Sequence, residues 1–113
     1  MFSIAFVFRR REGMSLEEFH EHYRDVHSKV ATRMPGLIGY TQHPVRRDAP
    51  AIGDHLPESD IPFDAISVYT YESDEAAAAA FTSEINAELE ADSVKMIDFS
   101  NMITLPVAVR KVL

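Results

Sequence analysis

The histidines of this 113-residue sequence lie close together, all within residues 20–55. His27 comes four residues after Tyr23 and seven after His20, so a helix would place the three side chains along one edge. Imidazole titrates near neutral pH, and a tyrosine hydroxyl can hold or polarise an oxygen atom. If Tyr40 faces His27 across a pocket, the two form a proton-transfer pair. The alternative interpretation of His27 is a histidine at the core edge that hydrogen bonds the backbone.

Asp64 is a candidate third member of this group, because it follows a long loop and stands at the start of a predicted strand. A carboxylate there could orient His27 or accept a proton. The alternative is a strand-end aspartate in water. His22 shares a predicted helix face with Glu18 and Asp25, which is typical of residues in contact with solvent.

Other common catalytic arrangements are missing from the sequence. With no cysteine there is no disulfide, no thiolate nucleophile and no cysteine-ligated metal. The histidines lack the tight spacing of metal motifs such as H-E-x-x-H. There is no G-x-S-x-G elbow and no glycine-rich phosphate loop. We therefore expect no metal and no cofactor, and any chemistry to be cofactor-free.

Two β-α-β units are predicted to position these side chains. In the first, Phe2–Phe8 alternates as a strand with apolar residues on both faces. Ser15 and Glu18 match a capping box that opens a helix running to about Arg33. A second strand follows over Leu37–Val45. The predicted apolar stripe of the helix consists of Leu16, Phe19, Tyr23, Val26 and Val30.

The second unit follows a loop predicted over residues 47–62, which is rich in proline and acidic residues. Phe63–Tyr71 is predicted to be a strand, and the alanine run begins a helix that continues towards Met96, with a break near Asn86. Asn101–Val109 is the last predicted strand, and its proline favours an edge position. In the strand over Leu37–Val45, alternation places Tyr40 and Leu37 on opposite faces.

This order predicts one α+β domain over residues 1–113, a ferredoxin-like βαββαβ fold with a four-stranded antiparallel sheet and two helices on one face. The first strand is apolar on both sides, so the uncovered sheet face needs a partner. A two-fold homodimer that packs sheet on sheet, forming an α+β barrel, is the simplest closed solution.

Net charge and hydropathy limit the classes of partner that the protein can bind. The net charge is −7, which argues against nucleic acid as a partner. The run Arg9–Arg11 is predicted to be a solvated strand end, with a local anion site as the alternative. The apolar runs are far shorter than the ~20 residues of a membrane helix, so no membrane partner is expected. No signal peptide is visible, which favours a cytoplasmic location.

Several motifs together resemble the EthD family of the dimeric α+β barrel superfamily. They are REGMSLEEF at residues 11–19, Tyr23, His27, MPGL at residues 34–37 and Tyr40. The stretch PFDAI at residues 62–66 is similar to the family's entry into its third strand. The resemblance implies a ferredoxin-like monomer that dimerises through its sheet. It also implies that His27 and Tyr40 are pocket residues, and that Asp64 belongs to the same pocket.

Within the family, the layout is similar to that of methylmuconolactone methylisomerase-like proteins. A small enzyme of this kind would hold a lactone or phenolic acid between the helices and the sheet, with Phe6, Phe19, Tyr23 and Phe81 as substrate-binding residues. His27 would move a proton in an isomerase, cyclase or lyase reaction of aromatic catabolism. The alternatives are a cofactor-independent monooxygenase, and a non-catalytic accessory protein that binds a metabolite of a degradation pathway.

Overall fold

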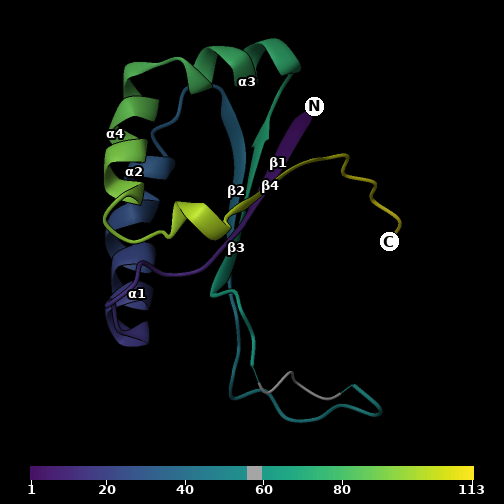
Figure 1. The fold of residues 1–113 in the computed structure, drawn as a ribbon. Coiled ribbons are helices and arrows are strands. Elements are labelled where there is room, and N and C mark those ends of the chain that lie inside the picture. The colour runs from purple at the N-terminus through teal and green to yellow at the C-terminus, as the bar shows by residue number, and fades with distance from the viewer. Residues whose placement is uncertain (56–59) are drawn as a thin grey trace.

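A computed structural model describes residues 1–55 and 60–113 (Figure 1). Its strands are β1 (Phe2–Phe8), β2 (Leu37–Pro44), β3 (Ala65–Tyr71) and β4 (Ile103–Val107). They form one sheet in the order β2-β3-β1-β4, and each neighbouring pair is antiparallel. The order of elements and the sheet are those of a ferredoxin-like fold, so the predicted fold class is confirmed.

The helices form two arms on the same face of the sheet. The first arm consists of α1 (Leu16–His22), the π-helical turn η1 (Tyr23–His27) and α2 (Ser28–Ala31). The second consists of α3 (Asp74–Phe81) and α4 (Glu84–Ser93), and the 3-10 turn η2 (Phe99–Asn101) leads into β4. The predicted cap is present, because the Ser15 hydroxyl accepts a hydrogen bond from the Glu18 N–H at 3.1 Å.

The π-helical turn corrects the predicted apolar stripe of the first arm. Tyr23 and His27 are 1% and 3% exposed, whereas Val26 is 45% exposed. A π turn holds more residues than an α turn, so the side chains that follow are rotated away from regular helical spacing. The predicted inward position of Val26 is therefore wrong, and His27 points inward.

A β-bulge likewise corrects the predicted faces of β2. The register of β2 on β3 shifts between Leu37 and Gly39, which leaves Ile38 as the extra residue, 54% exposed. Leu37 and Tyr40 both pack against the same core cluster. Strict alternation would separate these two residues, but the bulge changes the alternation.

The second unit differs from prediction mainly in its boundaries. The helical break lies at Ser83, not at Asn86: the Ser83 hydroxyl accepts a hydrogen bond from the Asn86 N–H at 3.3 Å and caps α4. β3 and β4 are each shorter than predicted. The predicted loop over residues 47–62 falls partly on residues 56–59, outside the described residues.

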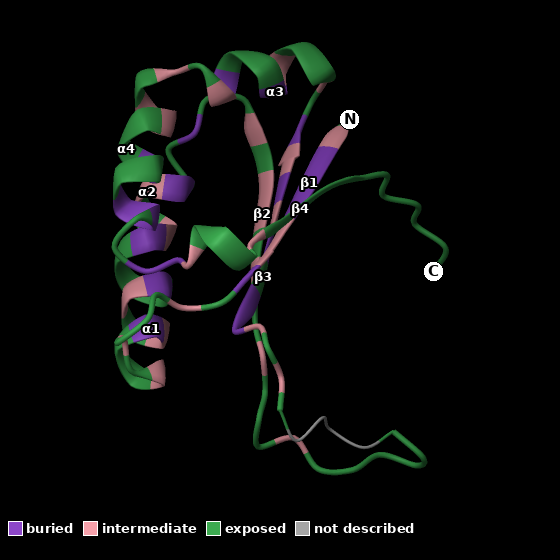
Figure 2. Cartoon of the chain, viewed as in Figure 1, coloured by how far each residue is buried: buried purple, intermediate pink, exposed green. Residues whose placement is uncertain are grey.

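The two faces of the sheet are covered differently. Buried residues lie on the inner sides of the helices and along the central strands (Figure 2). On the other face, Ile103, Leu105 and Val107 of β4 are between 40% and 44% exposed. The residues after β4 curve towards that uncovered face in Figure 1. The sheet thus carries an apolar face that the monomer leaves open.

Phe19→Ala is expected to lower the free energy of unfolding by about 3–5 kcal/mol, because Phe19 is fully buried against Phe8 and Tyr23. Val26→Ala is the matched control on the same arm and should change it by less than about 0.5 kcal/mol. Urea unfolding measures both. A large cost for Val26→Ala would mean that the helix keeps regular α-helical spacing through this turn.

Candidate functional site

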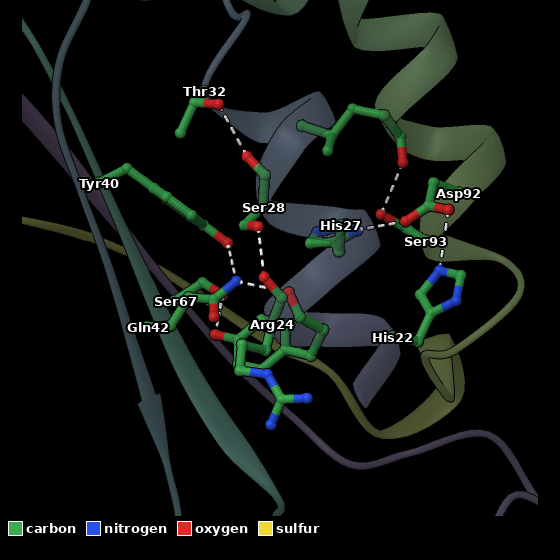
Figure 3. A network of polar contacts seen from close by, with 12 residues as sticks. His22, Arg24, His27, Ser28, Thr32, Tyr40, Gln42, Ser67, Asp92 and Ser93 are labelled. Atoms are coloured by element: carbon green, nitrogen blue, oxygen red, sulfur yellow. Dashed lines mark hydrogen bonds and ion pairs between the residues drawn. The ribbon is translucent and has the colours of Figure 1, made fainter. Parts of the chain in front are cut away.

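His27 is fixed by a carboxylate from the other helical arm. Its Nδ1 lies 2.8 Å from Oδ2 of Asp92 on α4 (Figure 3). Both residues are buried, with His27 3% and Asp92 6% exposed. A carboxylate accepts hydrogen bonds, so Nδ1 carries the proton and Nε2 keeps its lone pair. Among the described residues, Asp92 is the hydrogen-bond partner of the ring, so Nε2 is left for a ligand.

The same carboxylate holds a second histidine. Oδ1 of Asp92 lies 2.8 Å from Nε2 of His22, whose side chain is 21% exposed. Sequence reasoning placed His22 in water and did not single out Asp92. One signal was available: Asp92 follows Leu89 by three residues and Ile85 by seven, which puts it on the inward face of α4. An aspartate on a buried face needs a partner.

Burial controls the protonation state of His27. Loss of hydration lowers its pKa from the ordinary value of 6.5, and the hydrogen bond and charge of Asp92 oppose this shift only in part. The ring is therefore neutral at pH 7. With the proton held on Nδ1, its Nε2 keeps a lone pair that can accept a hydrogen bond or a proton.

Tyrosine and serine hydroxyls gather between His27 and the sheet. Tyr23 Oη and Ser67 Oγ are 2.6 Å apart. The amide of Gln42 donates to Tyr40 Oη at 2.9 Å and to the Tyr23 carbonyl at 2.8 Å. Burial raises the pKa of Tyr23, Tyr40 and Tyr69. These phenols stay protonated at neutral pH, so they serve as hydrogen-bonding groups and not as bases.

A cavity of about 310 Å³ lies between the sheet and α4. Apart from six polar residues, its lining side chains are aromatic or aliphatic. The polar residues are His27, Ser67, Tyr69, Asn86, Glu90 and Ser93. A concave apolar site with a few convergent polar groups is typical of small-molecule binding.

The structure brings some of the predicted site residues together at this cavity. Phe6 and Phe81 line it together with His27. Phe19 and Tyr23 do not: they belong to a core cluster, 0% and 1% exposed. Tyr40 is also outside the lining, but its ring packs on Tyr69, a lining residue, with 4.7 Å between centroids. It can therefore act on a ligand only through its neighbours.

Asp64 lies in a different environment from His27. Its carboxylate accepts hydrogen bonds from the Arg10 backbone N–H at 2.7 Å and from Arg10 Nη1 at 2.8 Å, and Arg47 Nη2 lies 3.0 Å away. Arg47 also donates to the carbonyl of Phe63. The hypothesis that Asp64 orients His27 must be corrected, because Asp92 does so. Asp64 instead binds Arg47, and this contact holds the two ends of the segment between β2 and β3 together.

Within residues 1–55 and 60–113, no group of three or more histidine, aspartate or glutamate side chains gathers in a way that could hold a metal ion. No helix in this part of the chain combines the length and the apolar character needed to cross a membrane.

A profile of the EthD domain matches residues 11–100. The chain belongs to the EthD family. The match includes both helical arms and the strands β2 and β3, and therefore both His27 and Asp92. A search of curated protein sequences gave no significant match.

Solved structures share the fold at low sequence identity. An ethyl tert-butyl ether D (EthD) family protein from Bacillus halodurans is 15% identical with a TM-score of 0.71, over 97% of this chain and 100% of that one. HapK from Hahella chejuensis is 14% identical with a TM-score of 0.67, over 100% of this chain and 98% of that one. A dimeric ferredoxin-like protein of unknown function from Thermobifida fusca is 14% identical with a TM-score of 0.65, over 96% of this chain and 92% of that one.

Acid is expected to destabilise the protein through His27. Because its folded-state pKa lies below 6.5, the native state binds fewer protons than the unfolded chain, and stability falls as pH drops below about 6.5. Urea unfolding at pH 7.5 and 5.5 should show a larger loss for the wild type than for His27→Gln, whose amide can still donate to Asp92. Equal losses in the two proteins would remove His27 as the cause.

Proposed function

We propose that this EthD protein is an enzyme that moves a proton on a small lactone or phenolic compound held in the cavity beside His27. The observation that carries this proposal is the His27–Asp92 pair: Nδ1 is fixed at 2.8 Å, and Nε2 is left on a cavity wall. A buried neutral imidazole with one nitrogen anchored by a carboxylate is well suited to general-base catalysis.

The step begins with transfer of a proton from a C–H or O–H bond of the substrate to Nε2 of His27. The electron pair of that bond stays on the substrate as an enolate or phenolate, and the imidazolium is stabilised by Asp92. Ser67 and Tyr69 line the same cavity and can hydrogen bond the anion. Return of the proton to a different atom isomerises the substrate. Alternatively, attack by the anion on a carbonyl carbon closes a ring, the π electron pair moves to the carbonyl oxygen, and the resulting alkoxide takes the proton back from His27. The scheme needs no cofactor.

The other predicted site residues have supporting roles in this proposal. Phe6 and Phe81 supply apolar walls for a planar substrate. Tyr40 fixes the ring of Tyr69 by packing on it, so Tyr40 is a positioning residue. Phe19 and Tyr23 support η1 from within the core.

The protein acts as a homodimer in this proposal. The apolar face of the sheet, with its exposed Ile103, Leu105 and Val107, supports a second copy as the partner. The Thermobifida fusca relative in fold is itself described as dimeric. Sheet-on-sheet association would leave both helical layers, and hence both cavities, on the outside.

His27→Gln is expected to lower kcat/KM by about 100-fold or more while the fold is retained, because it removes the base. The measurement is turnover in a screen of lactones and phenolic compounds, followed by absorbance, with oxygen uptake recorded in parallel. His55→Ala changes an exposed histidine outside the cavity and is the control.

Unchanged turnover in His27→Gln would remove His27 from the mechanism. Substrate-dependent oxygen consumption would instead indicate a monooxygenase. Binding without turnover of any compound in the screen would favour an accessory protein over an enzyme.

Leu105→Lys is expected to convert the dimer into a monomer, because it buries a charge within a sheet-on-sheet contact. Val94→Lys is the control, since Val94 is 58% exposed on the helical side. Sedimentation velocity measures both variants. A dimeric Leu105→Lys would place the subunit contact elsewhere.

A further inference from the structure

The charged side chains that line the cavity are acidic. Among the residues that line it, none is a lysine or an arginine, while Glu90 contributes a carboxylate at its edge. Asp92 adds a second carboxylate directly behind His27. Residues 56–59, which the structure does not describe, contain no basic side chain either. Among the described residues, a ligand in this cavity therefore meets the carboxylates of Glu90 and Asp92 and no lysine or arginine in the lining.

The cationic side chains gather in a different place. A separate groove of about 470 Å³ is lined by Arg9, Arg10, Arg11 and Arg47. Three of these arginines are already paired: Arg9 Nε lies 2.9 Å from Asp98, and Arg10 and Arg47 share Asp64. Arg9, Arg10 and Arg47 are thus engaged with Asp98 and Asp64, and none of the three lines the cavity beside His27.

Two of the polar donors that line the cavity, Asn86 and Ser93, are also occupied. Asn86 Nδ2 donates to the Phe81 carbonyl at 2.9 Å and to Glu90 Oε1 at 3.3 Å. The Ser93 hydroxyl donates to the Leu89 carbonyl at 2.8 Å. An incoming carboxylate would lose its hydration and find these donors engaged.

We infer that the cavity selects an uncharged substrate, a planar aromatic or conjugated carbonyl compound without an ionised carboxylate. This inference rests on the proposed function and narrows its substrate class. When an uncharged substrate gives its proton to His27, the new anion faces the new imidazolium, so the net charge of the cavity does not change. A carboxylate substrate would become a dianion beside Asp92 and Glu90, which is unfavourable in an apolar site.

The test compares coumarin with coumarin-3-carboxylate, two planar lactones that differ by one ionised group. Calorimetry at pH 7.5 on the intact protein measures both, and NMR of the His27 ring reports occupancy of the cavity. Coumarin is expected to bind at least 10-fold more tightly. Asn86→Lys places a cation in the lining and is expected to improve coumarin-3-carboxylate binding at least 10-fold with little effect on coumarin.

Glu84→Gln is the matched control, because it makes the same change in net charge on α4 at an exposed residue outside the cavity lining. It should leave the preference for coumarin unchanged. Equal or tighter binding of the carboxylate to the wild type would overturn the charge inference and leave the proposed proton transfer standing. Absence of any His27 response to either compound, up to their solubility limits, would overturn both proposals.

Discussion

The hydrogen bond between His27 and Asp92 joins the two helical arms of the protein inside its core. Asp92 is buried between two imidazoles, and each of its oxygens has a partner at 2.8 Å. Removing either histidine would leave part of a buried charge unpaired, which is far more costly than loss of a surface ion pair. Packing of α4 against the first arm, the tautomer of His27 and the shape of the cavity wall all depend on this contact.

The charged side chains differ between the end of β1 and the neighbouring cavity. At the end of β1, arginines and aspartates bind one another and fasten the segment between β2 and β3. At the cavity, the walls are mostly apolar and the charged groups are acidic. A histidine in such surroundings stays neutral because burial outweighs its carboxylate partner. The same surroundings strengthen any hydrogen bond that His27 makes to a ligand in the cavity.

Local sequence patterns were sufficient to predict most of the fold. The capping box at Ser15, the alternation in Phe2–Phe8 and the alanine run each act over a few residues, so each could be recognised without the rest of the chain. Asp92 could not be paired with His27 in this way, because 65 positions separate them. The bulge at Ile38 and the π turn were missed for a related reason: tertiary packing decides where one residue departs from its period.

The π turn has a consequence for how the site can be altered. It behaves as a helix that carries one residue more than its hydrogen-bond ladder accommodates. A substitution within Tyr23–His27 changes a side chain but leaves the backbone path in place. If all of its residues were kept and the turn closed into a continuous α-helix, every later side chain of the arm would turn by about 100° around the axis. Deletion of one residue would instead remove the extra residue and leave the later side chains in place. The orientation of the histidine thus depends on the π turn and not on sequence spacing alone.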